Sequence, residues 1–332
     1  MAINILGAAQ LKSQPSSSEP GAYISVEQLL QLRHLAKGLT IDTRKKSKAM
    51  SDGDSHTHFR GRGMEFSEVR PYQPGDDIRN IDWRVTARTQ QTYTKLFQEE
   101  RERPVFIVVD QRSHLFFGSQ QVFKSVFAAQ LASVIAWIAV QNNDRIGALV
   151  IGDYEQTDLR ARRGKHAALA LINQIHQYNQ KLSSPILPSV NHQHSPIEMK
   201  DILSDLRRVA KPGSAIFVLS DFHDFTESCR ESFSMLARHT DVSLVKVFDP
   251  LEYALPAHAQ LSISNGTDRM TVGTDTRNFL EDYSNAFKGT QSMLSRCCIN
   301  AGAALLNVDI SSSIAQHTQD IFANSSRGGG QR

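Results

Sequence analysis

The sequence is short of cysteine and of excess charge, and each shortage excludes a class of protein. Three cysteines in 332 residues, Cys229, Cys297 and Cys298, are too few for a disulfide framework. No Cys-x-x-Cys or cysteine–histidine spacing indicates a zinc site, so we expect reduced, buried thiols. The net charge is only +3. Between Arg33 and Arg103 basic and acidic residues are interleaved, which favours local ion pairs over nucleic-acid binding.

Long hydrophobic runs are also missing. The longest, Phe127 to Val140, is interrupted by Gln130 and Ser133 and falls short of the ~20 residues that cross a bilayer. The N-terminus has no basic segment followed by a long apolar core, so we predict no signal peptide. There is no Gly-x-x-x-x-Gly-Lys-Ser/Thr loop to hold ATP. We therefore expect a cytoplasmic protein with no nucleotide site of its own.

The segment from Gly61 to Asp110 has an unusual density of special residues, and the rest of the chain reads as scaffold around it. It combines two glycines, a Pro-Gly-Asp-Asp turn, an Ile-Asp-Trp-Arg step and a strand ending in an acid. We divide the chain into a flexible leader (1–20), an N-terminal helix with this signature segment (21–103), a sheet domain (104–324) and a disordered tail (325–332). In the helix, Ser25 and Gln28 form a predicted capping box and Gly38 a predicted end.

Beyond residue 104, short apolar strands alternate with helices. This alternation predicts an α/β fold with a doubly wound, mostly parallel sheet. Gly152-Asp153 predicts a tight hairpin turn between two strands, and Asn265-Gly266 predicts a second hairpin. The expected strands of the sheet are 105–109, 145–151, 154–159, 214–219, 242–248 and 303–308. The expected helices are 122–140, 165–178, 197–209, 225–239, 276–299 and 312–322.

Ligands of such sheets bind outside the carboxyl ends of the strands, which draws attention to two strand ends. One carries Asp110-Gln-Arg-Ser-His114, and the other carries Ser220-Asp221-Phe-His-Asp224. An acid after the first strand and a Ser-Asp after the central strand resemble a von Willebrand factor A-type domain. That resemblance implies a metal-ion-dependent adhesion site, in which hydroxyls and carboxylates hold Mg²⁺ and a partner's acid completes the coordination.

The sequence departs from this adhesion-site pattern. Arg112 and His114 stand where the two serines are expected, and we find no match for the distant threonine. We therefore expect Arg112 to form an ion pair with Asp110 or Asp221 where a metal would sit. Ser113 or Ser119 could instead supply a hydroxyl ligand, so a partial Mg²⁺ site is the alternative. The candidate metal ligands are Asp110, Ser113 and Asp221, and the candidate partner-binding residues are Arg112, His114, Ser220 and His223.

A second resemblance is to the bacterial family called domain of unknown function 58. It is carried by Arg60–Phe66, Val69–Arg79, Ile81–Trp83, Ala87-Arg88 and Lys95. The family places this signature directly before a von Willebrand A-like domain, as this chain does. The resemblance implies association with a MoxR-type AAA+ ATPase in assembling or activating client proteins. Membrane-anchored von Willebrand A-domain proteins are further implied partners.

Read by themselves, the signature residues indicate a rigid, self-paired module. Gly61 and Gly63 permit unusual backbone conformations, and Asp76 and Asp77 can bond nearby amides. Trp83 is expected to anchor the segment against the sheet domain. Its arginines are expected to pair with its acids, giving a charged surface suited to docking. The signature residues are Gly61, Gly63, Glu65, Arg70, Pro74, Gly75, Asp76, Asp77, Arg79, Asp82, Trp83, Arg88 and Lys95.

An enzyme is the alternative class. Asp76 and Asp77 could share acid–base work in a hydrolase, but adjacent turn residues usually point apart and no nucleophile accompanies them. Ser113 and His114 are neighbours rather than a converging dyad. We therefore expect a non-enzymatic adaptor without a cofactor, with a Mg²⁺-dependent binding module as the main alternative. The client and the oligomeric state do not follow from the sequence.

Overall fold

The computed structural model describes residues 21–41, 64–99, 104–182, 195–264, 269–275 and 277–322. The chain divides into two compact units, one formed by residues 1–43 with 104–332 (the sheet unit) and one by residues 44–103 (the signature unit). The expected leader and tail lie outside the described residues, as do Gly61 and Gly63. One predicted boundary is wrong, because the N-terminal helix belongs to the sheet unit rather than to the signature segment.

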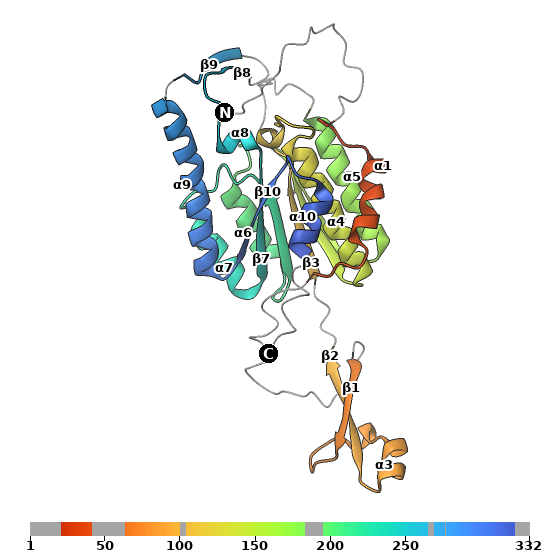
Figure 1. Ribbon diagram of the computed structural model, residues 1–332. Helices are drawn as coiled ribbons and strands as arrows, with labels where there is room; N and C mark the ends of the chain where they lie inside the picture. Colours follow the sequence, from red (N-terminus) through yellow and green to blue (C-terminus); the bar gives the residue numbers. More distant parts are fainter. Residues whose placement is uncertain are drawn as a thin grey trace. The chain divides into compact units, whose positions relative to one another are not determined.

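The sheet unit is built on six strands in the order β10-β7-β6-β3-β4-β5 (Figure 1). Neighbours are parallel except for β4 and β5, which the expected Gly152-Asp153 turn joins as an antiparallel pair. The prediction of a mostly parallel, doubly wound α/β sheet is therefore confirmed. The strands are β3 (Pro104–Asp110), β4 (Arg145–Ile151), β5 (Gln156–Arg163), β6 (Ala215–Ser220), β7 (Asp241–Phe248) and β10 (Ala304–Asp309).

Helices cover both faces of this sheet (Figure 1). Alternate residues of β3 supply the two cores, Val105, Ile107 and Val109 to one face and Phe106 and Val108 to the other, as the two-residue strand period requires. The first face carries α1 (Val26–Gln31), the 3-10 helix η1 (Leu32–Ala36), α4 (Lys124–Gln141), α5 (Lys165–Lys181) and α10 (Ile314–Phe322). The second carries α6 (Met199–Val209), α7 (Cys229–His239) and α9 (Arg277–Ala301).

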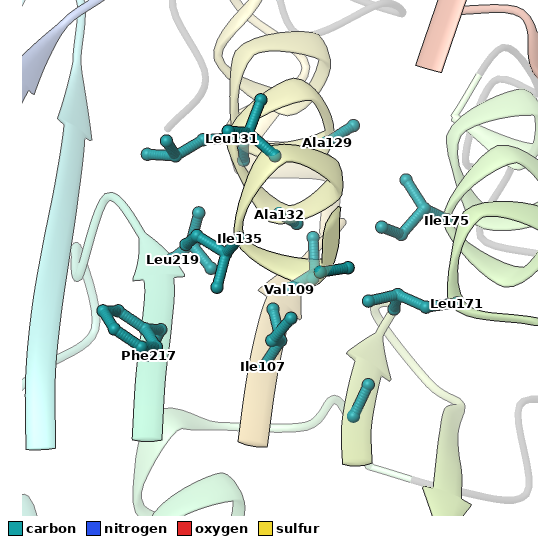
Figure 2. Close-up of a cluster of buried hydrophobic side chains, with 14 of the residues drawn as sticks. Ile107, Val109, Ala129, Leu131, Ala132, Ile135, Leu171, Ile175, Phe217 and Leu219 are labelled. Atoms are coloured by element: carbon teal, nitrogen blue, oxygen red, sulfur yellow. The ribbon is translucent and has the colours of Figure 1, made fainter. Parts of the chain in front are cut away.

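Helix α4 is the centre of the larger core. Figure 2 shows Ile107 and Val109 of β3 beneath it, with Leu171 of α5 on one side and Leu219 of β6 on the other. The helix is apolar on all sides because the sheet, α1, α5 and α10 surround it. By length and composition α4 could cross a membrane. From the sequence we expected its apolar run to be too short for that. However, 83% of the helix is buried inside the fold. A helix buried in a protein core can have the same length and apolar composition.

The N-terminal helix is fastened to the sheet unit by its polar ends as well as its core face. The capping box of Ser25 and Gln28 is confirmed. Leu29 is fully buried in the core, and the backbone amide of Ile24 donates to Oδ1 of Asn179 on α5 at 3.0 Å. The backbone amide of Phe123, just before α4, donates to the carbonyl of Gly21 at 2.9 Å. The first residues of the described chain therefore support the start of α4.

Two smaller elements complete the sheet unit. The turn helix η3 (Ser113–Leu115) follows β3, and α8 (Pro250–Tyr253) follows β7. The antiparallel strands β8 (Gln260–Ser264) and β9 (Arg269–Gly273) confirm the second predicted hairpin, whose turn lies outside the described residues. All three cysteines are buried free thiols, as expected.

The signature unit contains two strands that the sequence analysis did not predict. Strands β1 (Met64–Pro71) and β2 (Tyr93–Glu99) pair antiparallel, with the 3-10 helix η2 (Ile78–Asn80) and α3 (Trp83–Thr89) between them. The Pro74-Gly75 turn is observed, with Gly75 at a φ of 110° that favours glycine. Asp77 caps η2, and Asp82 caps α3 by accepting from the amides of Arg84 and Val85.

The expected self-pairing of the signature unit is only partly observed. Arg70 pairs with Asp76 at 2.7 Å, and Lys95 pairs with Asp82 at 3.3 Å. Among the described side chains, Arg79, Arg84 and Arg88 make no ion pair, because Asp77 and Asp82 are used as helix caps instead. Trp83, expected to be an anchor, is 68% exposed. The unit therefore presents free arginines and an exposed tryptophan.

Candidate functional site

The candidate site lies at the carboxyl end of the sheet, where β3, β6 and β7 end side by side. Asp110 ends β3, Ser220 ends β6, and Asp249 follows β7. Parallel pairing of these strands aligns their ends, so acids from distant parts of the sequence meet at one edge. Asp110, Ser220 and Asp249 are almost fully buried, which means that each must be held by hydrogen bonds or opposite charges.

Arg112 is the central cation of this edge. Its Nε and Nη2 donate to the two carboxylate oxygens of Asp110 at 3.0 and 2.7 Å. Its Nη1 and Nη2 donate to the oxygens of Asp224 at 2.6 and 3.2 Å, and Nη1 also donates to the carbonyl of Ile197 at 3.0 Å. Two bidentate pairs satisfy the planar guanidinium geometry. Arg112 thus links the end of β3 to the loop after β6 and to the segment before α6.

The same contacts decide whether a Mg²⁺ adhesion site fits this edge. Both oxygens of Asp110 accept from Arg112, and Oδ2 also accepts from the hydroxyl of Ser220 at 2.7 Å. The hydroxyl of Ser113 donates to Asp153 at 3.0 Å and, among the described residues, makes no hydrogen bond to Asp110 or Asp221. A fixed guanidinium charge occupies the position of the cation. The expected ligand set of Asp110, Ser113 and Asp221 therefore does not converge, and the Mg²⁺ site does not fit.

A second ion-pair group lies beside the first. Lys124, in the first turn of α4 and 2% exposed at its side chain, donates to Oδ2 of Asp221 at 2.8 Å and to Glu252 of α8 at 2.7 Å. Glu252 in turn accepts from the backbone amide of Asp249 within the capping box of α8. A charged lysine therefore ties the start of α4 to the ends of β6 and β7.

Burial and charge act in opposite directions on these groups. Burial alone would lower the pKa of Arg112 and of Lys124, but the carboxylates beside each cation outweigh it and raise both pKa values. Burial would raise the pKa of Asp221, but Lys124 and His114 hold it well below its usual range. The pKa of Asp224 is lowered too, because the hydrogen bond and charge of Arg112 outweigh its burial. Arg112, Lys124, Asp221 and Asp224 are therefore each held in the charged form by their partners.

Two histidines lie on the solvent side of the same carboxylates. Nδ1 of His114 is 3.1 Å from Oδ2 of Asp221, and Nδ1 of His223 is 3.6 Å from Oδ1 of Asp221 and 3.6 Å from Asp224. The two imidazole rings have centroids 3.8 Å apart. Nε2 of His114 is buried without a hydrogen-bond partner, 3.7 Å from Oδ2 of Asp110. Burial opposes a charge on His114, but Asp221 and Asp110 raise its pKa above the ordinary value.

The backbone at Phe222 places these groups. Phe222 has a φ of 56°, which is rare for a bulky residue, and its side chain is fully buried. Its amide donates to the hydroxyl of Ser220 at 3.1 Å. The left-handed residue reverses the chain, so that Asp221 faces Lys124 while Asp224 faces Arg112. Such conformations persist where surrounding contacts over-determine them, often at functional sites.

Two serines hold the loop after β3 in place. The amide and hydroxyl of Ser113 both donate to Oδ1 of Asp153 at 3.0 Å, which fixes η3 to the β4–β5 turn. The amide and hydroxyl of Ser119 donate to Asp249 at 2.6 and 2.7 Å. Ser119 was the other candidate for rescuing metal coordination, and its hydroxyl is used to fix the loop to the end of β7.

The structure brings most of the predicted site residues together but changes their roles. Asp110, Arg112, His114, Ser220, Asp221 and His223 all lie in the network described above. Arg112 and Ser220 are 3% and 0% exposed, so our expectation that they contact a partner directly is wrong. Both side chains instead point into the fold and donate hydrogen bonds to Asp110. His223, with 48% of its side chain exposed, is the most accessible of the predicted partner-binding residues.

Sequence reasoning missed Lys124 and Glu252. Lys124 carries a recognisable signal, because a lysine in the first turn of an otherwise apolar helix requires a buried partner. Glu252 follows the Asp249-Pro250 step at the capping-box spacing, which predicts a helix start but not a contact with Lys124.

The signature unit offers a second surface. Ile78 and Trp83 are 67% and 68% exposed, and Arg84, Ala87 and Arg88 are exposed on the same short helix as Trp83. Residues three and four apart on a helix share a face, so Trp83, Arg84, Ala87 and Arg88 form one patch. Tryptophan and arginine are the residues most enriched among energetically dominant interface positions. The patch has the composition of a docking surface.

Comparison with solved structures gives distant neighbours. A crystal structure of the conserved hypothetical protein BatB from Bacteroides thetaiotaomicron is 15% identical, covers 66% of this chain and 98% of its own, and has a TM-score of 0.37. A von Willebrand factor type A protein from Catenulispora acidiphila is 10% identical, covers 48% and 35% respectively, and has a TM-score of 0.27. The sheet's own strand order and helix layers establish a doubly wound, mostly parallel α/β fold.

Comparison with known sequences identifies the family. An uncharacterized protein of Mycobacterium tuberculosis is 26% identical over 275 residues, covering 81% of this chain and 82% of that protein. The uncharacterized protein YeaD of Bacillus subtilis is 38% identical over 83 residues, which cover 25% and 20% of the two chains. The family model described as "Protein of unknown function DUF58" matches residues 68–292, which include most of the signature segment and the whole strand-end network. The chain belongs to the DUF58 family.

Proposed function

We propose that this protein is a non-enzymatic adaptor that works with a MoxR-type AAA+ ATPase in the assembly or maturation of client proteins. The carboxyl end of the sheet contacts one protein, and the Trp83 patch of the signature unit contacts another. ATP hydrolysis belongs to the partner. We place the adaptor in the cytoplasm, where it meets the ATPase and any membrane-anchored von Willebrand A-domain partner.

The observation that carries the proposal is the position of Arg112. Its guanidinium is bonded to Asp110 and Asp224, so the acid that a metal ion at this strand end would need is already held by a permanent protein charge. A guanidinium held by two carboxylates is neither a nucleophile nor an acid or base near neutral pH. The arrangement suits a preformed binding face better than a reacting centre or a Mg²⁺-dependent one.

The test is co-purification from extracts of the source cell with the tagged full-length chain. We expect a MoxR-type ATPase in the wild-type sample and a severalfold lower yield with Trp83→Ala, because the exposed indole is the largest apolar group of the patch. Ile299→Ala is the matched control, since Ile299 is 74% exposed on α9, outside both proposed surfaces. Absence of any AAA+ ATPase from the wild-type sample, in repeated preparations, would remove the proposal.

A further inference from the structure

The two histidines of the strand-end site have a geometry that contact with a partner protein does not by itself require. His114, Asp221 and His223 each offer one ligand atom, and these atoms all lie within 4.8 Å of one another. His114 comes from η3, and Asp221 and His223 flank Phe222 in the turn after β6. Two imidazoles and a carboxylate are a ligand set of borderline-soft metals rather than of Mg²⁺.

The three ligand atoms lie within 4.8 Å of one another, so a modest movement of the imidazoles brings them to the spacing of a small tetrahedral ion. Zinc bonds to nitrogen and carboxylate oxygen of ~2.0 Å place neighbouring ligand atoms about 3.3 Å apart. The separation of His114 Nδ1 from Asp221 Oδ2 is 3.1 Å, and that of His223 Nδ1 from Asp221 Oδ1 is 3.6 Å. His223 has 48% of its side chain exposed, so it can adjust and an ion can enter from solvent.

The charge around the trio also favours a divalent cation. The two ion-pair groups contain four carboxylates, of Asp110, Asp221, Asp224 and Glu252, but only the two cations Arg112 and Lys124. The carboxylates exceed these two cations by two charges, which favours positive charge at the trio, supplied by a proton on His114 or by a divalent cation. The unpartnered Nε2 of His114, 3.7 Å from an oxygen of Asp110, lies in the same excess of negative charge.

Lys124 does not displace the ion. It approaches Oδ2 of Asp221 from the buried side, whereas His223 faces Oδ1. Hydrogen bonds to a ligating carboxylate fix its orientation in metal sites, and Lys124 is placed to do so here. Lys246 is buried beside Phe287 and makes no ion pair among the described residues.

We propose that His114, Asp221 and His223 bind one divalent transition-metal ion of the zinc class, with the fourth coordination position open toward solvent. Metal binding needs a lone pair on Nδ1 of His114: the imidazolium form releases its Nδ1 proton to solvent and keeps Nε2–H, and the neutral Nδ1–H form moves its proton to Nε2. The site differs from a Mg²⁺ adhesion site in its imidazole ligands and in its metal. It goes beyond the adaptor proposal and does not depend on it.

The experiment is a titration of the full-length protein, stripped of metal by a chelator, with Zn²⁺ by calorimetry and with Co²⁺ by visible absorption. We expect one equivalent of Zn²⁺ to bind in the micromolar range or tighter, a Co²⁺ spectrum of tetrahedral type, and no heat with Mg²⁺. His223→Gln and His114→Gln should each weaken Zn²⁺ binding by at least about tenfold. His239→Gln, an exposed histidine at the end of α7, is the matched control and should bind as the wild type does.

His223→Gln is the decisive variant, because its half-exposed side chain can be replaced without opening the buried ion pairs. Its thermal midpoint without metal should equal that of the wild type. Undiminished Zn²⁺ affinity in His223→Gln and His114→Gln would place the metal elsewhere, for example on His56 and His58, and would overturn the proposal. The absence of saturable Zn²⁺ binding by the wild type would do the same.

Discussion

At the scale of the residue, Arg112 explains more of the strand-end site than any other side chain. An arginine with 4% of its side chain exposed is tolerated only when its donors and charge are satisfied, and Asp110, Asp224 and the Ile197 carbonyl satisfy them. Buried ion pairs add little net stability compared with apolar packing, but removing one partner leaves the other charge buried without a counter-charge. The cost of losing Arg112 is therefore the cost of leaving Asp110 and Asp224 uncompensated.

Arg112→Met should lower the free energy of unfolding by about 3–5 kcal/mol, the range for breaking a buried pair. Urea denaturation followed by circular dichroism measures the change. Arg230→Met is the control, because Arg230 pairs with Glu227 at 2.7 Å on the surface, where ion pairs contribute little, and its urea midpoint should not move. Equal midpoints for Arg112→Met and the wild type would show that the buried network does not hold the loops.

At the scale of the element, the ends of helices and turns carry much of the architecture. Asp82 caps α3, and the hydrogen bond from the amide of Val85, with those from Lys95 and the amide of Arg84, lowers its pKa against the opposing effect of burial. A carboxylate whose folded-state pKa is depressed stabilises the fold above its unfolded pKa of ~3.9, and this contribution is lost as the pH falls through the folded pKa.

Acidification below about pH 4 should therefore loosen α3, with the adjacent Trp83 as a fluorescent reporter. Asp82→Asn keeps an oxygen acceptor at the cap but cannot titrate, so the Trp83 signal of this variant should not change over the same pH range. The buried Trp137 is replaced by Phe in both proteins to leave one reporter. The same acid transition in Asp82→Asn as in the protein that retains Asp82 would assign it to another group.

Gly21 provides a second test at this scale. Its φ is 104°, and an added Cβ would lie 1.9 Å from the carbonyl oxygen of Gln121. Gly21→Ala should cost about 1–2 kcal/mol for the left-handed backbone and about 1–3 kcal/mol more for the overlap. Gly213→Ala is the matched control, because Gly213 has a φ of 83° but nothing within 4 Å. Equal loss of thermal stability in the two variants would show that the N-terminal segment is not held against the loop before α4.

The elements also show what a sequence can predict. Strands covered on both faces, such as β3 and β6, are continuous apolar runs in the sequence and could be predicted. The start of α1 could be predicted from the capping-box residues Ser25 and Gln28. The hairpin of β1 and β2 was missed because its strands are separated by a long insert of turns and a short helix. The pairing of Lys124 with Asp221 was missed because 97 residues separate them, and only the assembled sheet brings them together.

At the scale of the whole molecule, the chain combines two preformed surfaces carried by separate compact units. The sheet unit holds its strand-end face with ionised pairs, so the face is ordered before a partner arrives. The signature unit uses Asp77 and Asp82 as caps and leaves Arg79, Arg84, Arg88 and Trp83 exposed. A molecule of this kind is suited to holding two proteins together, which is the central claim of the account.

That claim is tested most directly by calorimetric titration of the purified full-length chain with a purified MoxR-type ATPase from the same organism. The account predicts saturable binding that Trp83→Ala weakens at least severalfold, while His223→Ala, which alters the surface assigned to the other protein, and Ile299→Ala leave it unchanged. Failure to bind the ATPase, with or without Mg²⁺ and ATP, would contradict the account. Equal affinity in all of these variants would contradict the surface that it assigns to the ATPase.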